Sequence, residues 1–245
     1  MNQKTTASFA CKIEGIESSL DVSEFKKFDN QETDPKKLDQ AIHNVSLGME
    51  LVSVVENAYD EIEAILSEVK PWVSPDLASN LENTQKSDFE RKVSQKLQKL
   101  DQVAKSFKHN DQKFLDGSMS ASANPDSHSF LVVGANGSPE NRINLNKSLN
   151  IPLITSETLG LGDLSIGSPQ KGLKGLMILE NSLAIINRLK QRSSALRTHL
   201  KEIKRHLATA VENHCAANSA PDSYGQTREI LRAATSFLRK DKREY

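Results

Sequence analysis

The chain has 245 residues, with 32 basic and 32 acidic side chains, a formal net charge of zero, only 5% aromatic residues and a mean hydropathy of −0.52. Zero net charge argues against a general polyanion-binding protein. Few aromatic and many charged residues are typical of elongated helical proteins, in which each helix is covered on one side only. The composition therefore favours an elongated helical protein.

The charge is distributed unevenly along the chain. Residues 171–245 hold 15 Lys and Arg against 7 Asp and Glu, which leaves 17 against 25 in the first 170 residues. A basic segment can bind nucleic acid or anionic membranes, but here the basic residues alternate with a heptad pattern of apolar residues, as on a solvated coiled-coil face. We expect no nucleic-acid and no membrane partner, and we expect the acidic and basic ends of the chain to complement each other.

The first element that we expect to be stable is a long helix over residues 35–70. Asp34 suits the N-cap, Pro35 suits the first helical position, and Pro71 disfavours helix for the residue before it. Apolar residues recur at every seventh position of this segment, which is typical of a helix that packs along another helix. These residues are Leu38, Val45, Val52, Tyr59 and Leu66.

A shorter helix is predicted over residues 88–108, after a connector over residues 71–80. Ser87 and Glu90 have the spacing of a capping box at its start. The small polar residues 116–127 indicate a loop, which begins the part of the chain where the helical period is lost.

A β-hairpin region is predicted over residues 129–166. Residues 130–133 and 142–145 are expected to form two strands, joined by a turn at Asn136 and Gly137. Such a short hairpin must pack on helices to be stable.

A second long helix is predicted over residues 169–217, where Ser168 and Pro169 repeat the start signal of the first. Its apolar residues form two columns with a seven-residue period, interrupted by Ser193. Two long stripes at opposite ends of the chain should pack antiparallel, with the shorter helix beside them. The residues that we predict for its side of this seam are Leu179, Ile186, Leu189, Leu196, Leu200, Ile203 and Leu207.

The resulting fold prediction is mainly α, an elongated antiparallel helical rod or coiled coil with a small β-hairpin region. Residues 34–217 form the rod domain, and residues 1–33 and 222–245 form a discontinuous terminal domain. The C-terminal segment is predicted to be a helix with an uncovered apolar face, which can gain cover by packing against other copies. This face consists of Ile230, Leu231, Ala234, Phe237 and Leu238.

The residues indicate no catalytic, cofactor or metal site. Gly160 and Gly162 lack the third glycine and the neighbouring strand of a dinucleotide loop, and His199, His206 and His214 lack the i, i+4 spacing of a metal pair on a helix. Neighbouring acids such as Asp60 and Glu61 are interpreted as a solvated face.

The two cysteines do not have the spacing of metal ligands. Cys11 and Cys215 can form a disulfide only if the two chain ends lie together, and the sequence leaves this open. No apolar run has the length of a signal peptide or a membrane span.

The order of these segments and their local sequences resemble those of bacterial flagellins. FLVVGANG is similar to the family's Phe-Gln-Val-Gly-Ala-Asn hairpin, and ILRAATSFL is similar to its Ile-Leu-x-x-Ala-x-Thr-Ser-x-Leu terminal helix. LENSLAIINRLKQRSSALR resembles the Ile-Asp-x-Ala-Leu … Arg-x-x-Leu-Gly-Ala run. The termini diverge from the family and are shorter: KKFDNQETDPKK precedes the first long helix, and the charged RKDKREY stands at the C-terminal end.

This resemblance implies a non-enzymatic structural subunit of the flagellar filament that assembles axially with itself or with other flagellins. It also implies secretion to the flagellum without a cleaved signal peptide, through the flagellar type III export machinery and with a C-terminal export chaperone. Two alternatives remain: a minor junction or capping flagellin paralogue, which the divergent termini favour, and a coiled-coil adaptor that does not polymerise.

Overall fold

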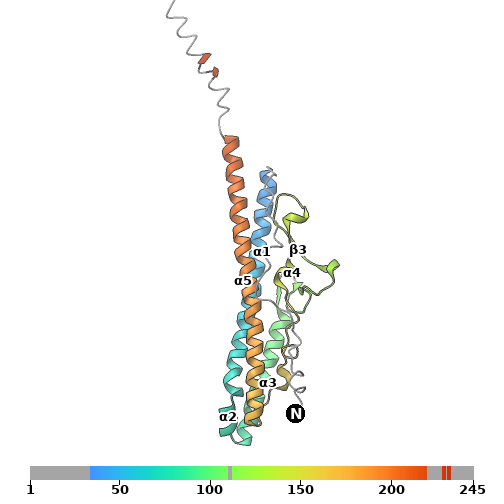
Figure 1. Ribbon diagram of the computed structural model, residues 1–245, viewed down its shortest axis with the longest axis vertical. Coiled ribbons are helices and arrows are strands. Elements are labelled where there is room, and N and C mark those ends of the chain that lie inside the picture. The colour runs from blue at the N-terminus through green and yellow to red at the C-terminus, as the bar shows by residue number, and fades with distance from the viewer. Residues whose placement is uncertain (1–33, 110–111, 220–227, 230, 233–245) are drawn as a thin grey trace, which may run out of the picture.

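The computed structural model describes residues 34–109, 112–219, 228–229 and 231–232. Two long helices and a shorter one form a narrow rod, and an irregular region with two short hairpins lies along one side of it (Figure 1). The predicted fold class, a mainly α elongated rod with a small β-hairpin region, is confirmed. The predicted N-terminal segment, residues 1–33, lies outside the described residues.

The two long helices are α1, Pro35–Val69, and α5, Pro169–Ser219. Both begin with the same local signal: the Asp34 side chain accepts a hydrogen bond from the Lys36 amide at 3.0 Å, and Ser168 Oγ accepts one from the Lys171 amide at 3.3 Å. At 1.5 Å per residue, the two helices are about 52 and about 77 Å long. After α1, the chain tightens into a 3₁₀ turn, Lys70–Val73, that contains Pro71.

The long helices run antiparallel along each other. Near the end of α1, Lys70 contacts Glu180 at 3.2 Å, and further towards its start Glu56 contacts Arg197. Residues earlier in α1 therefore lie beside residues later in α5, as expected for antiparallel helices. This is the most extensive contact between any two described elements.

The third long element is α3, Asn83–Ser106, which packs against α1. The predicted bounds of 88–108 and the predicted capping box are wrong. The capping box is formed by Glu82 and Gln85, so Ser87 and Glu90 lie inside the helix. The predicted connector is also mostly helical, because it contains the short helix α2, Pro75–Asn80.

Two carboxylates of α3 hold the loop that precedes α5. Glu90 accepts hydrogen bonds from Ser165 Oγ at 2.9 Å and from the Ile166 amide at 3.2 Å. About three turns later in α3, the Asp101 carboxylate accepts two hydrogen bonds from Ser156, one from its amide at 2.7 Å and one from Oγ at 2.8 Å. Charged acceptors make strong hydrogen bonds, so α3 fixes a loop that has little regular structure of its own.

The irregular region contains two antiparallel hairpins. In the first, β1, Lys108–His109, pairs with β2, Gln112–Lys113, and was not predicted. In the second, β3, Phe130–Val132, pairs with β4, Arg142–Asn144, with Leu131 opposite Ile143. The second hairpin lies where the sequence predicts it, and a short helix, α4, Leu145–Leu149, follows it directly.

The hairpin packs on α1 at a glycine. Asn44 Nδ2 donates a hydrogen bond to the Val132 carbonyl at 3.1 Å, which ties β3 to the helix. One turn along α1, a Cβ added to Gly48 would lie only 2.4 Å from Leu131 Cδ2 and 3.4 Å from Leu200 Cδ1. The absence of a side chain at Gly48 therefore lets the strand, α1 and α5 meet at one point.

We predict that Gly48→Leu separates the hairpin from the helices and lowers the free energy of unfolding by about 1–3 kcal/mol, the usual cost of overpacking a filled site. Chemical denaturation of the full chain measures this loss. Gly162→Leu is the matched control, because a Cβ at Gly162 meets no atom within 4 Å. Equal stability losses in the two variants would contradict the tight packing at Gly48.

Candidate assembly surface

The twelve residues predicted for the seam of the rod are all buried. Ten of them have no exposed surface at all, and the least buried, Ile203, is 4% exposed. The apolar stripes of α1 and α5 are therefore used within the chain. The full set is Leu38, Val45, Val52, Tyr59, Leu66, Leu179, Ile186, Leu189, Leu196, Leu200, Ile203 and Leu207.

Ion pairs with acidic residues on α1 and basic residues on α5 flank the seam. Lys190 Nζ lies 2.6 Å from both Asp60 Oδ1 and Glu63 Oε2, and these hydrogen bonds raise the pKa of Lys190. Arg197 contacts Glu56 and donates to Ser53 Oγ at 2.9 Å. Burial raises the pKa of the Glu56 carboxyl, although the charge of Arg197 opposes this shift. The expected complementarity of the acidic and basic helices is thus visible as specific contacts.

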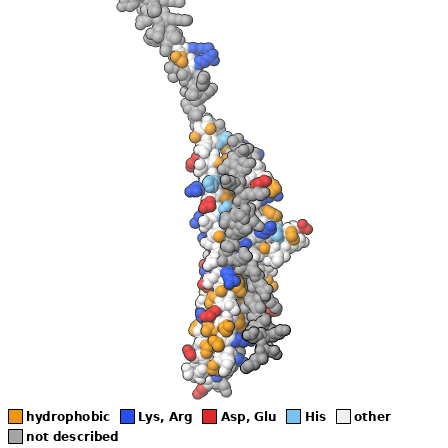
Figure 2. All heavy atoms as spheres, in the orientation of Figure 1, with side chains coloured by type: hydrophobic (Ala, Val, Ile, Leu, Met, Phe, Trp, Pro, Cys, Tyr) orange, Lys and Arg blue, Asp and Glu red, His pale blue; other side chains and the backbone are white. Residues whose placement is uncertain are grey.

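Three large apolar side chains in the described parts of α1 and α5 are exposed: Leu47 on α1, which is 45% exposed, and two near the start of α5. Near the start of α5, Leu173 is 54% exposed and Met177, one turn later, is 60% exposed. Figure 2 shows hydrophobic side chains gathered towards this end of the rod. Two partly exposed side chains give an area smaller than the largest patch of an ordinary monomer, so this patch alone does not indicate an interface.

The predicted C-terminal assembly face falls almost wholly outside the described residues. Of its five members, Leu231 is described, lies in a helical stretch and is 60% exposed. Ile230, Ala234, Phe237 and Leu238 lie outside the described residues. Cys215 is exposed near the end of α5, and Cys11 also lies outside the described residues.

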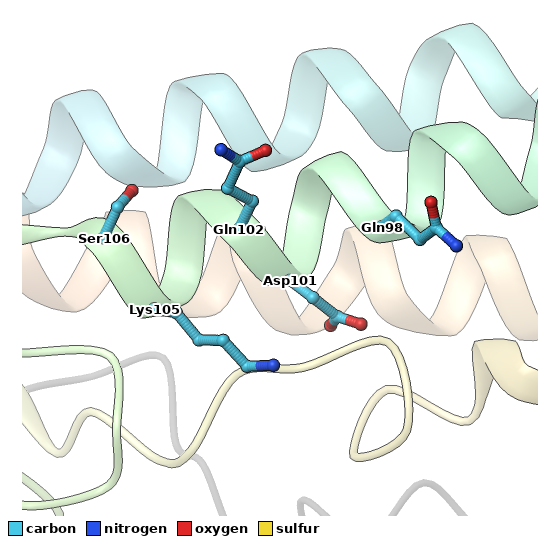
Figure 3. Close-up of a pocket in the computed structure, with 5 residues that line it drawn as sticks. All are labelled: Gln98, Asp101, Gln102, Lys105 and Ser106. Atoms are coloured by element: carbon cyan, nitrogen blue, oxygen red, sulfur yellow. The ribbon is translucent and has the colours of Figure 1, made fainter.

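A shallow hollow of about 400 Å³ lies along α3, lined by Gln98, Asp101, Gln102, Lys105 and Ser106. Asp101 and Lys105 point towards the loop that runs past α3, and Gln102 and Ser106 point to the other side of the helix (Figure 3). Asp101 is already engaged by Ser156. The lining consists of this hydrogen-bonded carboxylate and of uncharged polar and lysine side chains, so the hollow does not indicate a reactive site.

The histidines on α5 do not converge on a common point. Burial lowers the pKa of His199, whereas His206 is exposed one heptad away. Among the described residues, no three His, Cys, Asp or Glu side chains are placed to hold a metal ion together. No described helix is both long enough and apolar enough to cross a membrane.

This chain matches a protein family model and a curated flagellar protein. The family model of the bacterial flagellin N-terminal helical region matches residues 18–120, which include α1 and α3. The flagellar filament 30.7 kDa core protein of Treponema maltophilum is 23% identical to this chain over 202 residues, which cover 79% of this chain and 69% of that protein. This chain is thus similar to bacterial flagellins. The resemblance seen in the sequence is therefore confirmed.

Flagellins are structural proteins of the flagellar filament and not enzymes, so the prediction of a non-enzymatic structural role in the flagellum is confirmed. The segment that matches the flagellin family model includes α1 and α3 of the rod. Sequence reasoning missed the loop-holding role of Glu90 and Asp101 in α3. Their spacing of eleven residues, three turns of one helix face, was the available signal.

We predict that Lys190→Met lowers the free energy of unfolding at neutral pH by about 0.5–1 kcal/mol, because the ion pairs that it removes are partly exposed. Since the pKa of Lys190 is raised in the folded chain, its contribution is fully present below its ordinary value of about 10.5 and is lost as the pH rises through the folded value. The measurement is chemical denaturation of the unchanged protein and of Lys190→Met at several pH values between 7 and 12.

The control for this prediction is Lys201→Met, which removes an exposed lysine from the same helix. The stability difference between Lys190→Met and the unchanged chain should shrink at high pH, and that of the control should be small throughout. A difference for Lys190→Met that stays constant up to pH 12 would show that lost packing, and not charge, explains it.

Proposed function

We propose that this chain is a structural subunit of a bacterial flagellar filament that assembles axially, with itself or with other flagellins, through its terminal segments. The observation that carries this proposal is the flagellin match over residues 18–120 together with the seam that its helices form. Because the seam stripes of α1 and α5 are buried within one chain, contacts between copies need another apolar surface. We infer that the predicted C-terminal face is that surface, and the exposure of Leu231, 60%, supports this.

The proposal divides the chain into a rod, residues 34–217, and a discontinuous terminal domain, residues 1–33 and 222–245. The rod gives each subunit a fixed length, and the terminal segments join subunits. The same resemblance supports export through the flagellar type III machinery, without a cleaved signal peptide, and an export chaperone that covers the apolar C-terminal face before assembly.

The test is seeded polymerisation of the purified full chain in a precipitating salt, followed by electron microscopy. We predict filaments from the unchanged chain and few or none from Leu231→Asp, because a charge in a packed interface is unfavourable unless it is paired. Both proteins should show the same helical circular dichroism, since the substitution lies outside the rod.

The matched control is Met177→Asp. Met177 on the rod and Leu231 in the terminal segment are equally exposed, at 60%. If filaments form through the terminal segments, Met177→Asp polymerises like the unchanged chain. Loss of filaments in Met177→Asp with retention in Leu231→Asp would place the contact on the rod, and monomers of the unchanged chain under every condition would count against the filament role.

A second candidate role, a minor junction or capping flagellin, is favoured by the charged run RKDKREY at residues 239–245. Unpaired charges in a packed contact are unfavourable, so this charged run would hinder the addition of further subunits. In the same assay, a capping protein mixed with an ordinary flagellin shortens the filaments in proportion to its share, whereas a filament subunit is incorporated without shortening them.

A further inference from the structure

Tyr59 on α1 and Ser193 on α5 lie at the same level of the rod. Glu56 pairs with Arg197 on one side of this level, and Glu63 pairs with Lys190 on the other. Tyr59 lies between the two glutamates along α1, Ser193 lies between the two cations along α5, and both side chains are 0% exposed. The largest fully buried side chain of the described residues thus shares a layer of the seam with one of the smallest.

Most of the seam does not distinguish this register from one that is shifted by seven residues. The apolar columns repeat with the heptad, and so do the cations of α5, Lys190, Arg197 and Lys204. A shift of one heptad would bring Arg197 to Glu63 and Lys204 to Glu56, so both acid and base pairs would be kept. It would also bring Lys190 towards Lys70, but repulsion between partly exposed charges is weak.

We infer that the size difference between Tyr59 and Ser193 sets the register of α1 against α5. A shift by one heptad in either direction places the Tyr59 ring against Leu200 or Ile186, where two large side chains overpack the layer. The same shifts place Ser193 against Leu66 or Val52, which leaves a void where the native layer is filled. Only the native register pairs the large residue with the small one.

The polarity of this layer agrees with a role in specificity. Neither the Tyr59 hydroxyl nor Ser193 Oγ has a hydrogen-bond partner among the described residues. A buried hydroxyl without a partner is unfavourable, so the layer does not maximise stability. In coiled coils, a single layer that departs from the apolar pattern is a common means of specifying register.

The register matters because it sets the geometry of the rod. A shift of seven residues moves α5 by about 10 Å along α1. That movement would change how far α5 extends past the start of α1, and it would separate Leu200 from the hairpin contact at Gly48. The Tyr59 and Ser193 layer therefore fixes the distance between the hairpin region and the end of the rod where α5 leaves it.

The test is a spin-label distance measurement on the full chain, with labels at Glu61 and Glu202 and with Cys11 and Cys215 replaced by serine. Both labelled positions are exposed, and in the native register they are offset by about 16 Å along the rod, so a shift in either direction changes the distance. We expect one distance for native residues at 59 and 193. We expect Tyr59→Leu with Ser193→Leu to add a second distance from a register shifted by about 10 Å.

Two further variants separate size from polarity and from misfolding. Tyr59→Phe keeps the large ring, and the exchange of Tyr59→Ser with Ser193→Tyr keeps one large and one small residue; both should give the native distance alone. A single native distance in the leucine double variant would overturn the inference. Should that variant lose its helical circular dichroism, the exchanged variant decides: the native distance supports the inference, and a shifted distance or loss of helix overturns it.

Discussion

The structure depends on the burial of two apolar helix stripes against each other. α1 and α5 come from opposite parts of the chain, and each would expose a long apolar face to water if it folded alone. Packed antiparallel, they bury Val52 and Leu200 completely and bring Glu63 to Lys190. Everything else is attached to this pair: α3 along α1, the hairpin at Gly48, and the loop before α5 through the carboxylates of α3.

The long helices and their pairing could be predicted because their signals are local and repeated. Asp34 with Pro35 and Ser168 with Pro169 mark the starts, and a heptad pattern marks the faces. The error at α3 has a physical cause. Ser87 and Glu90 have the spacing of a capping box, but Glu82 and Gln85 form one a turn earlier, and Glu90 is used by the loop at Ser165. A spacing rule cannot see such a distant partner.

The irregular region was the hardest part to predict, since its structure comes from contacts that are distant in sequence. Asn146 is fully buried and bonds to Ser118 and Ser129, which hold two loops together. Glycine is likewise unfavourable inside a helix, and its presence at position 48 is explained only by Leu131, which fills the space that a side chain there would need. The seam positions that the heptad pattern marked are buried in the structure. The predicted assembly face stays a prediction, and the matches to flagellins were needed to give the rod a functional meaning.

The central claim is that the α1 and α5 seam is the most stable unit of the chain, and hydrogen exchange of the full chain tests it most directly. Amides in α1 between residues 45 and 69 and in α5 between residues 182 and 207 should exchange most slowly and with similar protection, because they open only when the seam opens. The hairpin and α3 should exchange faster. Fast exchange in one long helix while the other stays protected, or stronger protection in the hairpin than in both, would contradict the account.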